Sequence, residues 1–215
     1  MIYIIDFSNW DPEFVKQKCQ AYQIVYSEFA YLQTCTKVAS LAIKERIRQD
    51  YHLEGELLTT RAGKPYFANT SLTFNISHHG NFCVAIVAEN KEQSNIEKET
   101  AEVGIDITDR NTIFNDEEKK QLYSQVPPSG LDGVFWAARE AYLKYLGVGY
   151  QENPVNMIVP SHTVFPNLLL NNSFIVLPVM RIESVYARLF SVGPLVGVVI
   201  ANYKDLHSVT IMDIK

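Results

Sequence analysis

The spacing of hydrophobic residues in the first half of the chain predicts a strand, two helices and then a pair of strands. The apolar run MIYIIDF at the start is typical of a buried strand. Asp11 followed by Pro12 is a typical helix start, because aspartate caps the first turn and proline already has a helical φ angle. Further along, apolar residues from Phe29 onward recur every three or four positions, which predicts a long helix. The predicted elements are residues 1–7, 11–22, 27–51, 71–77 and 82–89.

The second half repeats this order of elements. VGIDITD predicts a strand, and LDGVFWAAREAYLKYLG predicts a helix that ends at Gly147, while the chain after Pro154 is rich in strand-forming residues. The runs NFCVAIVAEN and PLVGVVIANY are candidates for matching strands. Between the halves, residues 89–102 are polar and lack periodicity, which predicts a connecting loop. We therefore expect an α+β fold with an N-terminal half, residues 1–102, and a C-terminal half, residues 103–215.

Composition and charge restrict the function. The 215 residues are 47% hydrophobic and 20% charged, as in ordinary globular proteins. A net charge of −5 argues against general nucleic-acid binding. No apolar run reaches the ~18 residues of a membrane span. The three cysteines, Cys19, Cys35 and Cys83, show no C-x-x-C spacing and favour a reducing, cytoplasmic compartment.

Two short stretches hold candidate metal ligands. Glu140 and Lys144 lie four residues apart and share a helix face, where the ordinary interpretation is a surface ion pair. Asp106 alternates with Ile105 and Ile107, so it faces away from the core that the isoleucines enter. With Glu140 it would supply two hard oxygen ligands suited to Mg²⁺. The alternative is that Asp106 is a solvated or capping residue.

Two other stretches suit a phosphate, although each is weak alone. In FNISHHG, Ser77 and His78 precede Gly80, and hydroxyl, imidazole and backbone N–H groups in a tight turn can bind phosphate. A plain hairpin turn is the alternative. Gly63, Lys64 and Pro65 form GKP, which is too short to be specific and is not a P-loop.

The order GKP, FNISHHG, VGIDI and FWAAREAYLKYLGVG resembles the 4′-phosphopantetheinyl transferases, in particular the larger monomeric type that activates surfactin synthetase. The resemblance covers roughly residues 30–150. It implies a pseudo-dimer of two α/β halves with coenzyme A between them. It also implies a Mg²⁺-dependent transfer of phosphopantetheine from coenzyme A to a serine of an acyl or peptidyl carrier protein, as in holo-acyl-carrier-protein synthases.

The resemblance also assigns roles. Asp106 and Glu140 would bind the metal, and Glu140 would act as the base toward the carrier serine. Lys144 would contact the diphosphate. Ser77 and His78 would hold the 3′-phosphate of coenzyme A. The adenine site would be lined by Gly63, Lys64 and Pro65.

The chain departs from the family pattern at three positions. Thr108 stands where many members have a third carboxylate, and its hydroxyl or a water it holds is the expected substitute in the metal site. Arg139 replaces the usual lysine before the helix glutamate and is expected to contact coenzyme A. Cys35 occupies the place of a basic 3′-phosphate contact, for which Lys37 or Lys44 could substitute.

Two other functions remain open. A coenzyme A or carrier-protein binder without catalysis would fit the loss of the third carboxylate, and a metal-dependent hydrolase of coenzyme A-like diphosphates would use the same groups. Because carrier proteins are typically acidic, we expect a local basic docking patch, with Lys119 and Lys120 as candidates.

Overall fold

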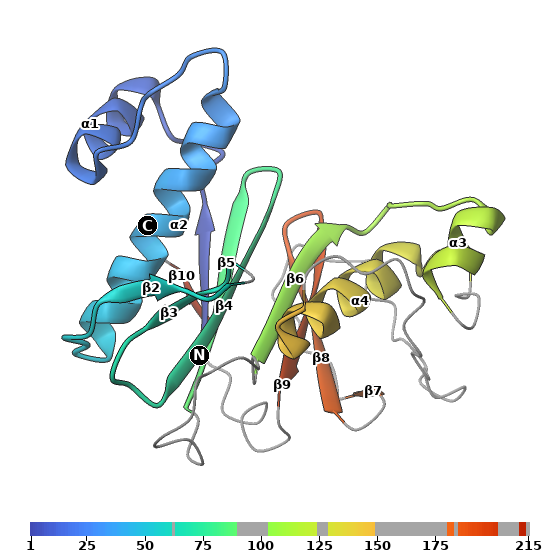
Figure 1. Cartoon of the computed structure of the whole chain (residues 1–215). Helices are drawn as coiled ribbons and strands as arrows, with labels where there is room; N and C mark the ends of the chain where they lie inside the picture. The colour runs from blue at the N-terminus through green and yellow to red at the C-terminus, as the bar shows by residue number, and fades with distance from the viewer. Residues whose placement is uncertain are drawn as a thin grey trace.

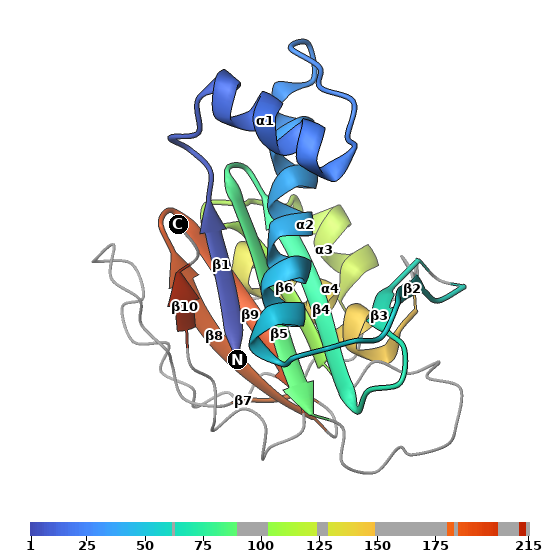
Figure 2. The same cartoon turned by 90° about the vertical axis from the view of Figure 1, so that its left-hand side faces the viewer.

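Each half of the chain folds as a helix against one face of a sheet, and the two sheets pack face to face (Figures 1 and 2). The computed structural model describes residues 1–61, 63–89, 103–123, 129–148, 180–182, 185–201 and 211–213. Of the loop predicted at residues 89–102, all but Glu89 lies outside this part, as does most of the strand-rich stretch after Pro154 up to residue 179.

The N-terminal half contains a four-stranded sheet and a separate two-stranded hairpin. The sheet has the order β10-β1-β5-β4, and the hairpin pairs β2 with β3. The elements are β1 (Ile2–Asp6), α1 (Pro12–Tyr22), α2 (Tyr31–Asp50), β2 (Leu57–Thr59), β3 (Pro65–Phe67), β4 (Leu72–His79) and β5 (Phe82–Glu89).

The C-terminal half contains the second four-stranded sheet, with the order β6-β9-β8-β7. Its elements are β6 (Val103–Asp109), α3 (Asp116–Leu122), α4 (Asp132–Leu146), β7 (Met180–Ile182), β8 (Val185–Val192) and β9 (Leu195–Ala201). The last strand, β10 (Ile211–Asp213), returns to the first sheet and pairs parallel with β1.

The two halves share one connectivity. In the first, strand β1 leads through α2 to the hairpin β4–β5, and β5 pairs antiparallel with both β4 and β1. In the second, β6 leads through α4 to β8–β9, and β9 pairs antiparallel with both β8 and β6. The runs NFCVAIVAEN and PLVGVVIANY form β5 and β9, which hold corresponding places in these two connections.

Three apolar clusters separate four layers. Val38, Ile43 and Ile47 of α2 pack on the outer face of the first sheet. The inner faces of the two sheets meet through residues such as Ile4 and Ile105. The outer face of the second sheet packs against α4. Side-chain alternation along β6 therefore directs its isoleucines between the sheets and its polar residues toward α4.

The boundaries of α1 and α4 agree with the sequence prediction, but the start of α2 does not. Asp11 caps α1 by accepting a hydrogen bond from Phe14 N at 2.8 Å, and Gly147 ends α4 in the left-handed region, with φ of 70°. The prediction that α2 begins near Ser27 and buries Phe29 is wrong. The helix begins at Tyr31, and Phe29 is fully exposed. Apolar spacing continued into the preceding loop by chance, so it did not mark the helix start.

Candidate functional site

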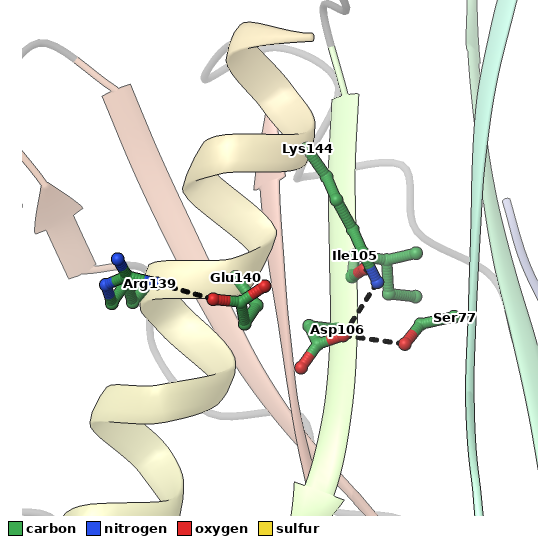
Figure 3. A network of polar contacts seen from close by, with 6 residues as sticks. All are labelled: Ser77, Ile105, Asp106, Arg139, Glu140 and Lys144. Atoms are coloured by element: carbon green, nitrogen blue, oxygen red, sulfur yellow. Dashed lines mark hydrogen bonds and ion pairs between the residues drawn. The ribbon is translucent and has the colours of Figure 1, made fainter. Parts of the chain in front are cut away.

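Glycine at position 104 allows α4 to lie directly on β6. A Cβ atom there would stand 2.6 Å from the backbone nitrogen of Tyr145 and still closer to the carbonyl oxygen of Ala141. Any larger residue would push the helix away from the strand. This close approach brings Glu140 and Lys144 of α4 over Asp106 of β6 (Figure 3).

Asp106 is the centre of the polar contacts between the halves. Its Oδ1 atom accepts hydrogen bonds from Ser77 Oγ on β4 and from Lys144 Nζ on α4, each at 2.7 Å. Lys144 Nζ also donates to the carbonyl oxygen of Ile105 at 3.2 Å. Asp106 is 7% exposed, and its carboxylate is held by groups from two other elements, β4 and α4. The alternative of a solvated Asp106 is therefore wrong.

Glu140 lies one helical turn before Lys144 and faces the same strand. Its Oε1 atom accepts a hydrogen bond from Arg139 Nη1 at 2.6 Å. Burial raises the pKa of Glu140, and the negative charge of Asp106 raises it further, while Arg139 and Lys144 act in the opposite direction. Two carboxylates thus share a partly buried site with two cations, which is unlike the surface ion pair that spacing alone would suggest.

Thr108 lies two residues after Asp106 on the same face of β6 and is 4% exposed. Its Oγ1 atom is 3.5 Å from Oγ1 of Thr112, which is at the limit of a hydrogen bond. Thr108 therefore points to the same side of β6 as Asp106, and its hydroxyl is buried there.

Ser77 and His78 belong to strand β4, which corrects the expectation that they follow the strand and lie in a tight turn before Gly80. His78 pairs with Cys83 and His79 with Phe82, so the strand extends to the two-residue turn at Gly80, where φ is 54°. Strand pairing uses this backbone, so it does not form an open phosphate-binding turn. Only the side chains of Ser77 and His78 could then contact a phosphate. Burial and then the charge of Lys144 lower the pKa of His78.

The GKP stretch forms the turn between β2 and β3. Thr60 N donates to the carbonyl oxygen of Lys64 at 2.8 Å, and Gly63 has φ of 81°. The Nζ atom of Lys64 lies 3.4 Å from the carbonyl oxygen of Val103, at the start of β6. Burial lowers the pKa of Lys64 to about 8. Since Val103 and Asp106 are three strand residues apart, Lys64 contacts β6 about 10 Å from the carboxylates.

Sequence reasoning gave no way to choose between Lys37 and Lys44, but the structure separates them. Lys37 is exposed on α2. Lys44 is partly buried, burial lowers its pKa, and its charge acts on Cys83, which is the strand partner of His78. Lys44 is thus the cation of α2 that is close to the His78 strand pair. Cys35 is buried in the core.

One ion pair in this half was not predicted. Lys119 Nζ lies 3.0 Å from Asp132 Oδ2 at the first turn of α4, and both side chains are largely buried. Lys119 is thus occupied in an internal contact, whereas Lys120 is exposed. No sequence signal marks this pair, because residues 13 apart on two helices meet only after the helices pack.

The described part of the chain shows no group of three or more histidine, cysteine, aspartate or glutamate residues able to hold a metal. It does show the two carboxylates of Asp106 and Glu140 on facing elements. Their oxygen atoms and mutual repulsion suit a hard divalent cation. Among the described helices, none is long and apolar enough to cross a membrane.

Comparison with known proteins gives two matches. Residues 102–171 match the model of the 4′-phosphopantetheinyl transferase superfamily, a segment that includes Asp106, Glu140 and Lys144. An L-aminoadipate-semialdehyde dehydrogenase-phosphopantetheinyl transferase of Schizosaccharomyces pombe is 26% identical over 137 residues, which cover 55% of this chain and 52% of the relative. The chain thus spans about half the length of this relative.

Proposed function

We propose that this chain is a 4′-phosphopantetheinyl transferase, which moves the phosphopantetheine arm of coenzyme A to a serine of an acyl or peptidyl carrier protein. The observation that carries the proposal is the meeting of Asp106, Glu140 and Lys144 at one point between β6 and α4. All three residues lie within the segment that matches the transferase superfamily.

We also propose a finer classification, which the topology and the motif resemblance support. The shared connectivity of the two halves supports a pseudo-dimer, with residues 1–102 and 103–215 as its halves and β10 returning to the first sheet. We assign the chain to the monomeric, surfactin-synthetase-activating type and expect it to act in the cytoplasm. From the net charge and the hydrophobic pattern we expect neither nucleic acid nor a membrane as a partner.

Mg²⁺ is the proposed metal, with Asp106 and Glu140 as its carboxylate ligands and Thr108 contributing through its hydroxyl or a water. When bound, the ion would neutralise and orient the diphosphate of coenzyme A. Asp106 is already fixed by Ser77, and this contact keeps one ligand in position before any ion arrives.

Two side chains of α4, Glu140 and Lys144, would each handle one proton transfer of the reaction. The carrier serine forms a new bond to the phosphorus of phosphopantetheine while the bridging P–O bond breaks and 3′,5′-adenosine bisphosphate leaves. Glu140, or a water it holds, takes the serine proton. Lys144 can turn from Asp106 to the leaving phosphate oxygen, donating a hydrogen bond or its proton as negative charge develops there.

The coenzyme A site extends from the carboxylates along the N-terminal half. We assign the 3′-phosphate to Ser77 and His78 together with Lys44, the cation that replaces the usual basic contact. Because Ser77 already donates to Asp106, its hydroxyl links the nucleotide site to the metal site. Gly63, Lys64 and Pro65 would line the adenine site beside the start of β6.

The experiment incubates the purified chain with coenzyme A, Mg²⁺ and either an apo acyl carrier protein or an apo peptidyl carrier domain. Transfer adds one phosphopantetheine arm to the carrier, which intact-protein mass spectrometry detects. Binding of coenzyme A without a mass change would instead favour the non-catalytic binder suggested by Thr108. Release of adenosine bisphosphate without any carrier would favour a diphosphate hydrolase. Either result would refute the proposed transferase.

A further inference from the structure

The side chain of Arg139 is fully buried immediately beside the proposed base. Its exposed fraction is 0%, and it is among the largest side chains with no exposure in the described part of the chain. Its guanidinium lies 5.8 Å from the ring centre of Trp136, and its Nη1 atom donates to Glu140. Burying an arginine is costly unless the charge is paired, so the position calls for a physical reason.

Neighbouring helix residues do not normally contact each other, because successive side chains diverge by about 100° around the axis. Arg139 points into the core while Glu140 faces β6. Only a long side chain can bend back across this angle to reach the carboxylate. Figure 3 shows the result, with Arg139 on one side of Glu140 and Asp106 on the other. The ion pair therefore fixes one oxygen of Glu140 and leaves the carboxylate directed toward the site.

A second ion pair joins the start of α4 to α3, since Lys119 pairs with Asp132. Burial raises the pKa of Tyr123, and the charges of Arg139, Asp132 and Glu140 also act on it. The cations of Arg139 and Lys119 are thus each paired with a carboxylate, one within α4 and one between α3 and the first turn of α4.

We propose that Arg139 is a positioning residue that holds Glu140 in the orientation needed to accept the serine proton. The effect on kcat rests on the proposed function, but the contact between Arg139 and Glu140 can be tested without that function. The earlier expectation that Arg139 contacts coenzyme A stays a prediction. In the structure its guanidinium has no exposed surface to offer a ligand.

The test is a double-mutant cycle of Arg139→Met and Glu140→Gln, with Arg139→Lys as a conservative variant and Arg46→Met as the control. Arg46 forms an arginine–carboxylate ion pair with Asp50 on α2, remote from α4, and is more exposed than Arg139. We expect Arg139→Met to lower kcat by about 10–100-fold, as loss of a supporting contact does, with the KM for coenzyme A nearly unchanged. Arg139→Lys should recover part of the loss, and the control should keep wild-type kcat.

The decisive measurement is the effect of Arg139→Met in a protein that already carries Glu140→Gln. If Arg139 acts through Glu140, Arg139→Met should cause no further loss of the residual single-turnover rate there. An equal loss in both backgrounds would overturn the inference, as would a lower melting temperature with unchanged kcat. If Arg139→Met fails to fold, Arg139→Lys completes the same cycle.

Thermal unfolding separates this inference from the proposed function. The single variants should each lower the melting temperature, and the double variant should lower it by less than their sum, because each single change leaves one buried charge unpaired. Additive shifts would overturn the pairing even in a fully active enzyme. An inactive wild type with non-additive shifts would instead refute the transferase while preserving the Arg139–Glu140 contact.

Discussion

Replacing Lys144 with methionine should change metal binding and turnover in opposite directions. In the structure Lys144 Nζ lies 2.7 Å from Asp106 Oδ1 and so pairs with the carboxylate oxygen that the metal would bind. A divalent cation must displace this ammonium group before it can bind the same oxygen. Methionine keeps most of the length and packing of the side chain but removes the competing charge.

The magnitude follows from the geometry of the pair. At 2.7 Å and an effective dielectric constant of ~20, the Coulomb attraction is about 6 kcal/mol. Desolvation offsets most of this, and hydrogen bonds to charged groups contribute about 1.5–3 kcal/mol net. The lysine side chain is 30% exposed, which favours the lower end. Lys144→Met should therefore tighten Mg²⁺ binding about tenfold, since ~1.4 kcal/mol is a factor of ten.

The assay is isothermal titration calorimetry of Mg²⁺ in the absence of coenzyme A, combined with carrier modification rates for the same samples. Lys120→Met is the matched control, because it removes an exposed lysine and the same net charge. We expect tighter Mg²⁺ binding and slower transfer for Lys144→Met only. Unchanged or weaker Mg²⁺ binding would refute the argument that Lys144 and the metal compete for Asp106.

Three further changes give distinct results. Thr108→Glu restores a third carboxylate and should lower the Mg²⁺ concentration for half-maximal rate; an equal or higher value would show that Thr108 does not face the metal. Gly104→Ala should lower the melting temperature by several degrees and slow transfer, because the Cβ of the new alanine would collide with the backbone of Ala141. A variant as stable as the wild type would contradict the close packing of α4 on β6. Lys64→Met should weaken coenzyme A binding. It should also stabilise the free protein at pH 7 by on the order of 1–3 kcal/mol, because burial lowers the pKa of Lys64 to about 8 and makes its charged form costly. This cost is present below the folded pKa of Lys64 and disappears as the pH rises above the ordinary value of 10.5. The stability difference between variant and wild type in denaturant unfolding should therefore vanish above that pH, and a difference independent of pH would refute the assignment.

Local pattern predicted the orientation of the side chains at the proposed site. Period-two alternation gave the orientation of Asp106, and helical spacing placed Glu140 and Lys144 on one face. Glycine at the end of α4 also had a local signal. These features could be predicted because each depends on a few neighbouring residues, whereas the assignment of a site depended on the family resemblance.

The features that failed or were missed depend on contacts between distant elements. Nothing in the sequence around Arg139 distinguishes a buried guanidinium from an exposed one, because its burial results from how α4 packs on the second sheet. The docking role expected for Lys119 ignored Asp132, whose ion pair forms only when α3 meets α4. Lys120 alone remains exposed for that role.

The most direct test of the central claim is the intact mass of an apo carrier protein after incubation with coenzyme A, Mg²⁺ and either wild-type protein or the Glu140→Gln variant. Glutamine keeps the shape of Glu140 but removes its charge and its ability to take a proton, so a loss of about 10²-fold or more is expected. The account predicts that wild-type protein adds one phosphopantetheine arm to the carrier and that the folded variant adds it at least that much more slowly. A carrier of unchanged mass with wild-type protein, or equal rates for the two proteins, would contradict it.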